Sequence, residues 1–159
     1  RELEQYKGVG PAKAISILAA CELGKRRAME KAQERTSIDS SKAIYEYLHP
    51  RMQDLDVEEA WIMLLNQHYK LIKAMAISHG GITETAVDVR VILKEALLCN
   101  ATVLVLAHDH PSNHIQPSKS DDQLTQRVKK ACEAVRIYFL DHVIVTDGTY
   151  YSYHDSGRL

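Results

Sequence analysis

The sequence has 159 residues, the size of one ordinary domain with at most a small appendage. Apolar residues make up 45% of it and charged residues 26%, which excludes a disordered, a collagen-like and a disulfide-stapled chain. The net charge of −1 is unevenly distributed, because residues 1–35 carry eight Lys or Arg against five Glu, while the remainder carries twelve against sixteen Asp or Glu. A weakly basic arm thus precedes a weakly acidic body.

The residues do not favour a membrane or a secreted protein. The longest apolar run, 101–107, is far shorter than the roughly 18 residues of a membrane span, and no basic-then-apolar leader opens the chain. Cys21, Cys99 and Cys132 form an odd set without a closely spaced pair, which argues against a disulfide framework and against a four-cysteine zinc site. We therefore expect a cytoplasmic protein that makes no membrane contact.

The first 35 residues predict a short helical hairpin. Helical stretches over 1–6 and 12–27 flank the turn at 7–11, where two glycines permit a tight backbone path and a proline suits the first turn of the second helix. The charged stretch 25–35 lacks an apolar stripe and indicates the helix end and a linker. We place the domain boundary after residue 35, so that the body covers 36–159.

The body predicts an α/β fold in which a mixed sheet is sandwiched by helices. Helices are expected over 36–48, stopped by Pro50, over 87–98, and from Ser118 or Ser120 to about 136; strands are expected over 60–65, 71–77, 101–107, 137–140, 142–146 and 150–153. The run 101–107 is apolar throughout, which is typical of a fully buried central strand. Functional residues in such sheets gather beyond the carboxyl ends of strands, so the residues after 107 are the expected site.

The segment that follows this strand concentrates metal-binding residue types. His108 and His110 alternate with one residue between them, so in an extended chain they face the same side and can meet one ion. Asp121 falls in the first turn of the next helix, where the helix dipole favours a carboxylate. Two imidazoles and a carboxylate suit Zn²⁺ with a fourth position left open. The alternative is a plain loop in which Ser118 and Asp121 only cap the helix.

The spacing of these residues resembles the JAMM motif of the MPN metalloprotease superfamily: His-x-His, seven residues, Ser, two residues, Asp. A closer resemblance is to the RadC-like branch. It rests on His-Asp-His-Pro-Ser-Asn from His108, Pro-Ser-x-x-Asp from Pro117 and Leu-Asp-His-Val-Ile-Val from Leu140, and the amino-terminal residues 7–14 with Glu-Leu-Gly at 22–24 extend it over nearly the whole chain.

This resemblance implies a JAMM/MPN fold, which is cytidine-deaminase-like, and a zinc-dependent hydrolase of amide or isopeptide bonds in peptide substrates. RadC-like proteins are also traditionally labelled DNA repair. Two positions depart from the family pattern: Asp109 stands where Asn is usual, and Asn113-His114 replaces Gly and a small or acidic residue. We expect His114 at the surface, with an extra metal ligand or a substrate contact as the alternatives.

The resemblance also implies a general base, which in this superfamily is a Glu that opens an early strand. The family spacing of Glu, one residue, then an aromatic selects Glu59, with Glu58 as the fallback. The alternative is a pair of solvated acids at a turn. Ser118 is expected to donate its hydroxyl to the oxyanion of a tetrahedral intermediate, or equally to cap the helix only.

The amino-terminal arm resembles the second half of a helix-hairpin-helix motif. In that motif the glycines, here Gly8 and Gly10, let backbone N–H groups approach nucleic-acid phosphate without reading sequence, and Lys7 and Lys13 flank the turn. Its first helix is short, so we expect a partial motif whose upstream partner is missing; a packing turn is the alternative. A second function hypothesis follows, a nucleic-acid-associated accessory protein with a structural or idle metal site.

Overall fold

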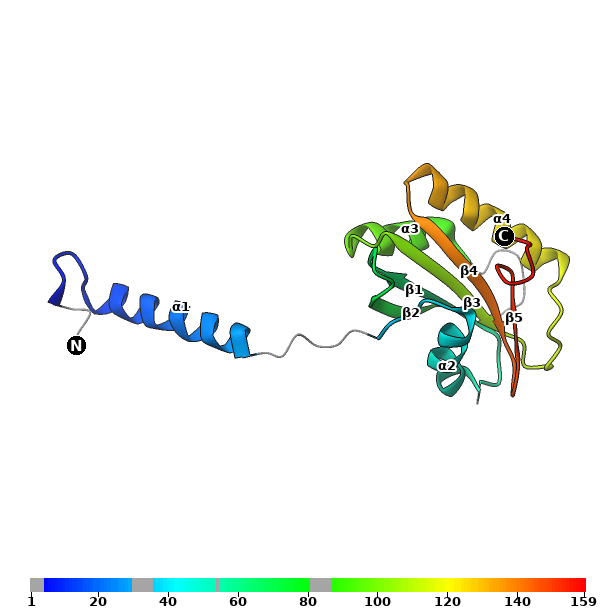
Figure 1. Ribbon diagram of the computed structural model, residues 1–159, viewed down its shortest axis with the longest axis horizontal. Coiled ribbons are helices and arrows are strands. Elements are labelled where there is room, and N and C mark those ends of the chain that lie inside the picture. The colour runs from blue at the N-terminus through cyan, green and yellow to red at the C-terminus, as the bar shows by residue number, and fades with distance from the viewer. Residues whose placement is uncertain (1–4, 30–35, 54, 81–86) are drawn as a thin grey trace. The chain divides into compact units, whose positions relative to one another are not determined.

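The computed structural model describes residues 5–29, 36–53, 55–80 and 87–159, and the chain divides into two compact units, Arg1–Glu34 and Arg35–Leu159 (Figure 1). In the first unit a turn leads into helix α1 (Pro11–Met29), with Pro11 at its first position as expected. The helix expected over 1–6 lies mostly outside the described residues. Within the described ranges, no helix is both long and apolar enough to cross a membrane.

The second unit is built on one mixed sheet of five strands. The strands are β1 (Glu59–Leu65), β2 (Leu71–His79), β3 (Val103–Asp109), β4 (Tyr138–Val145) and β5 (Tyr150–Ser152), in the spatial order β2-β1-β3-β4-β5. Of the strand pairs formed by the described residues, only β3–β4 is parallel. β3 is buried at every position and lies at the centre of the sheet, as its apolar sequence predicts.

Helices cover both faces of the sheet, so the expected sandwich is confirmed (Figure 1). Helix α2 (Ser41–Met52) packs on one face through Ile44, Leu48 and Met52, against alternate residues of β1, β3 and β4. Helices α3 (Val89–Leu98) and α4 (Lys119–Ala134) pack on the other face, against the intervening residues. We call these the α2 face and the α4 face. A side chain of the central strands therefore reaches one layer or the other according to its position in the pleat.

Two elements differ from the sequence-based expectation. The chain at 36–38 is extended, because its backbone bonds to residues 69–71, and α2 begins only after Ser40, whose side chain accepts the N–H of Ala43. Pro50 does not stop this helix: it lies inside the last turn, where its missing N–H removes one hydrogen bond and its fixed φ is compatible with the helix. The strands expected over 137–140 and 142–146 form the single strand β4.

Candidate metal centre

Four side chains meet beyond the end of β3. Glu58, His108, His110 and Asp121 each offer one ligand atom, and these atoms all lie within 4.8 Å of one another. Ala60 of β1 is paired with His108, so Glu58, two residues before Ala60, emerges on the same face as that imidazole. Asp121 reaches the group from the first turn of α4. The structure thus brings the three predicted metal ligands together and adds Glu58.

The nitrogen and oxygen atoms of this group converge on one point. Nε2 of His108 lies 2.9 Å from Nε2 of His110, and 3.1 Å from Oδ1 of Asp121. Nε2 of His110 lies 3.6 Å from Oδ2 of the same carboxylate. Oε1 of Glu58 lies 3.6 and 3.9 Å from the two imidazole nitrogens. Two imidazoles and carboxylate oxygens aimed at a shared centre form a donor set that suits Zn²⁺.

Each of the three predicted ligands forms a hydrogen bond with a group outside the cluster. Nδ1 of His110 bonds to the main-chain carbonyl of His114 at 2.5 Å, and Nδ1 of His108 bonds to Nε2 of His142 at 2.8 Å. Asp121 and Ser118 form a capping box at the start of α4, in which the Ser118 hydroxyl and N–H both bond to Oδ2 of Asp121. Such outer partners fix which atom of each ligand faces the metal. The bonds between Ser118 and Asp121 therefore both cap α4 and orient the Asp121 carboxylate.

The cluster shifts the acidity of its members. Burial raises the pKa of Glu58, although the nearby imidazoles act in the opposite direction. Burial also opposes the charge of Asp121, but the adjacent imidazoles of His108 and His110 and the N–H of Ser118 outweigh it and hold the pKa of that carboxyl well below its usual range. Burial lowers the pKa of His142 well below its ordinary value. The surroundings of Asp121 therefore favour its charged form, while Glu58 is the carboxylate whose proton affinity is increased.

Glu59, the general base expected from the sequence, does not face this cluster. Its carboxylate bonds to Nε1 of Trp61 at 2.9 Å and to Nδ1 of His79 at 2.7 Å, and its backbone N–H donates to Asp109. The physical reason is the pleat, because Glu59, Trp61 and Asp109 lie on the α2 face, opposite His108. The carboxylate at the cluster is Glu58, the fallback of the sequence analysis, so the expected position is corrected by one residue.

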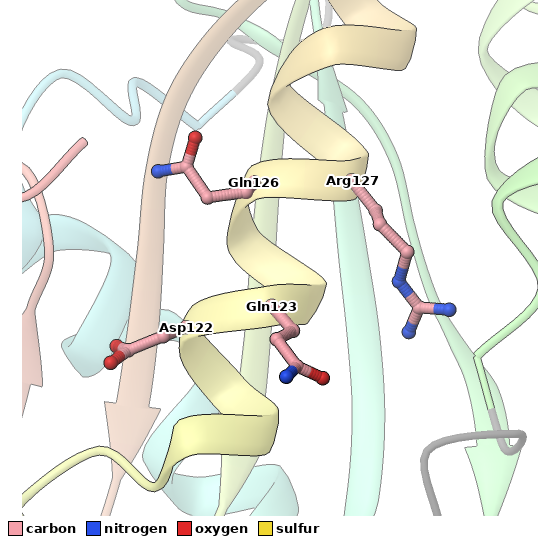
Figure 2. Close-up of a pocket in the computed structure, with 4 residues that line it drawn as sticks. All are labelled: Asp122, Gln123, Gln126 and Arg127. Atoms are coloured by element: carbon pink, nitrogen blue, oxygen red, sulfur yellow. The ribbon is translucent and has the colours of Figure 1, made fainter.

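The cluster opens into a cleft of about 760 Å³. Its lining includes Glu58, both ligand histidines, Ser118 and the exposed His114, and it continues along α4 to Arg127. A second hollow lies over the surface of α4, where Asp122 points to one side of the helix and Arg127 to the other (Figure 2). Asp122 is already bonded to Arg158 and to the Tyr153 hydroxyl. The cleft at the cluster, and not this second hollow, is lined by the four clustered side chains.

The predicted nucleic-acid contacts lie in the first unit. Gly8 has φ +87°, a conformation that favours glycine, and a Cβ at Gly8 or Gly10 would meet no atom within 4 Å. Nζ of Lys13 donates to the carbonyl of Gly8 at 3.0 Å, across the turn. Lys7 is exposed. The turn thus has an open backbone and two cationic side chains.

Sequence reasoning missed two residues of the site, His142 and Thr125. Both are fully buried between β4 and α4 and are linked to the ligands by hydrogen bonds. The segment 140–145 contributed to the family resemblance, yet its histidine is separated by more than 30 residues from the nearest predicted ligand histidine. A polar His inside an otherwise apolar strand was the signal that could have marked it.

The fold and the cluster define the class to which the chain belongs, that of JAB/MPN domains. A family model described as the RadC-like JAB domain matches residues 38–158, so the chain belongs to this family.

The chain is similar to UPF0758 proteins of several bacteria. That of Porphyromonas gingivalis is 43% identical over 155 residues, which cover 97% of this chain and 68% of the relative. That of Flavobacterium johnsoniae is 42% identical (98% and 68%), and that of Symbiobacterium thermophilum 36% identical (98% and 66%). The chain thus spans about two thirds of the length of these relatives.

Proposed function

We propose that this protein is a zinc-dependent hydrolase of amide or isopeptide bonds, with His108, His110 and Asp121 as metal ligands. The observation that carries the proposal is the convergence of two Nε2 atoms and the Asp121 carboxylate at one point of an open cleft. A bound zinc ion supplies Lewis-acid chemistry, which polarises a carbonyl and makes water nucleophilic near neutral pH.

Glu58 is the general base of the proposed reaction. Its Oε1 lies within 3.9 Å of both ligand nitrogens, close enough to accept a proton from water that attacks a substrate held at the cluster. Burial increases the affinity of this carboxylate for a proton, in the direction that general-base catalysis near neutral pH requires. Once protonated, Glu58 delivers the proton to the leaving amine, which completes the hydrolysis.

Ser118 is the proposed oxyanion donor. Its hydroxyl lines the cleft and donates to Asp121, so it already lies beside the reacting centre. To donate to a developing negative charge, the hydroxyl gives up its hydrogen bond to Oδ2 of Asp121, which keeps the bond from the Ser118 N–H. The cleft volume of about 760 Å³ suits a segment of peptide chain, in agreement with a peptide or isopeptide substrate. The cysteines are free, which agrees with a cytoplasmic location.

The test measures zinc content and peptide hydrolysis on the same samples. We expect about one zinc per chain in the wild type, and its loss from His108→Ala and His110→Ala, because each removes one of three ligands. His114→Ala is the matched control: the side chain is exposed, and the variant keeps the carbonyl that orients His110. Turnover is assayed on isopeptide-linked and linear peptides. Wild-type protein without metal, after preparation free of chelators, would disprove the zinc assignment.

A second candidate function, DNA binding by the arm in an accessory role associated with DNA repair, is favoured by one observation. The turn around Gly8 and Gly10 has open backbone beside Lys7 and Lys13. We expect any DNA binding to be independent of sequence, to weaken steeply with salt, and to disappear when residues 1–35 are deleted. Binding is measured by fluorescence anisotropy over a salt series. Equal binding by the body alone would refute the assignment to the arm.

A further inference from the structure

A buried chain of hydrogen bonds runs from His108, away from the cluster, into the layer between β4 and α4. Nδ1 of His108 lies 2.8 Å from Nε2 of His142, and Nδ1 of His142 lies 2.6 Å from the hydroxyl of Thr125. That hydroxyl donates to the main-chain carbonyl of Asp121, one turn earlier on α4, at 2.7 Å. His142 and Thr125 are both 0% exposed. The chain therefore connects two of the proposed zinc ligands through protein atoms alone.

The number of hydrogens available to this series of hydrogen bonds determines which atom donates and which accepts in each of them. Thr125 has a single hydroxyl hydrogen and gives it to Asp121, so its oxygen can only accept from His142. Nδ1 of His142 must then carry a hydrogen. A neutral imidazole has one N–H, so Nε2 of His142 is an acceptor, and Nδ1 of His108 is the donor of the bond between the two rings.

The surroundings of His142 keep it neutral. Its ring is stacked on that of Tyr153, with centroids 4.9 Å apart and 4° between the planes. Its two nitrogens bond to an imidazole and to a hydroxyl, and neither partner is a carboxylate that could balance a positive charge. A buried cation without such a partner is costly. The imidazole of His142 is therefore neutral and carries a single N–H.

We infer that His142 and Thr125 are positioning residues that hold a hydrogen on Nδ1 of His108, so that its Nε2 is the nitrogen that faces the cluster. The inference rests on the proposed zinc site. The other tautomer would place a hydrogen on Nε2, which metal binding would have to displace. His110 reaches the same state through the carbonyl of His114, which no side-chain substitution removes. His108 depends on two side chains that can be replaced.

The experiment compares Thr125→Val, which keeps the shape and removes the hydroxyl, with Thr125→Ser, which keeps the hydroxyl. Zinc affinity is measured by competition with a chromophoric chelator, and the tautomer of His108 by long-range ¹H–¹⁵N NMR of the zinc-free chain. Outer-shell changes typically weaken metal binding by about 10- to 100-fold, so we expect about tenfold for Thr125→Val and about 100-fold for His142→Phe. Thr125→Ser should match the wild type in both measurements, and Thr125→Val should show a mixture of tautomers.

Each outcome separates this inference from the zinc proposal. Unchanged zinc affinity and an unchanged tautomer in Thr125→Val would overturn the inference and leave the zinc site standing. If the wild type binds no zinc, the proposed function fails, and the NMR comparison alone decides whether the inference about His108 holds. A hydrogen on Nδ1 in the wild type and in Thr125→Ser, with a mixture of tautomers in Thr125→Val, supports the inference. Any other pattern overturns it. If His142→Phe does not fold, the Val and Ser variants give the deciding comparison.

Discussion

The two faces of the sheet carry similar residues at the same edge and use them differently. On the α4 face Glu58 joins two histidines and Asp121 around a centre that opens into the cleft. On the α2 face Glu59 bonds to Trp61 and His79, and Asp109 accepts the backbone N–H of Glu59. One step along an extended strand thus separates a carboxylate available for chemistry from one that holds the strand ends together.

The sharpest way to break this comparison is to exchange the two adjacent glutamates for glutamine in separate variants. Glu58→Gln should lower peptide hydrolysis by about 100- to 10,000-fold while zinc stays bound, because the amide keeps the shape and lacks the basic oxygen. Glu59→Gln should leave hydrolysis near the wild-type rate. Rates and zinc content are measured on the same preparations. Full activity in Glu58→Gln with loss in Glu59→Gln would restore Glu59 as the base.

Asp121→Asn separates a ligand from a base within the α4 face. The pKa of this carboxyl is held well below its usual range, which favours the charged form that binds a metal ion. The neutral amide of the Asn side chain is a weaker zinc ligand than a carboxylate, so we expect zinc occupancy to fall together with activity. Elemental analysis after dialysis gives the occupancy. Normal zinc content would show that Asp121 only caps α4.

Asp109→Ala probes the α2 face by its effect on folding. The substitution removes the acceptor of the Glu59 N–H, which lies 2.7 Å from Oδ1. Leaving a buried donor unsatisfied costs about 1–3 kcal/mol, and the Glu59 N–H is partly buried, so the free energy of unfolding in urea should fall by an amount near the lower end of that range. Asp109→Asn retains an acceptor oxygen and is the matched control, with a much smaller loss. A loss of the same size in both variants would show that the charge, rather than the hydrogen bond, matters.

Asp141 gives the smallest expected effect, a pH dependence of stability on the α2 face. Burial raises the pKa of this carboxyl, although Ser152 and the N–H of His154 bond to it. A raised folded-state pKa adds stability that is complete below the ordinary Asp value of about 3.9 and is lost as pH rises through the folded value.

Asp141→Asn lacks this titration, so its stability relative to the wild type should increase from pH 4 to pH 7. Urea unfolding with a chelator present in all samples measures the difference, which keeps zinc binding out of the comparison. A difference that does not change with pH would contradict the burial argument.

Much of this molecule was predictable from local pattern. The apolar run of β3 predicts a central strand, and the His-x-His spacing followed by Ser118 and Asp121 predicts three groups that the structure brings together. The errors arose where a longer-range contact competes with local preference. Residues 36–38 pair with the chain near Lys70 instead of starting α2, and Pro50 is tolerated because Leu48 and Met52 are buried around it.

The sequence by itself determined the donor types and their spacing, because His108, His110 and Asp121 flank a single strand-to-helix connection whose geometry follows from local rules. Only the tertiary structure decided which of two adjacent glutamates reaches them, since the register of β1 against β3 is set by pairing across the sheet. The same holds for His142 and Thr125, which meet His108 only because β4 and α4 pack beside β3. Sequence spacing predicts which residues lie close together within one helix or strand. Contacts between different helices and strands depend on how the core packs.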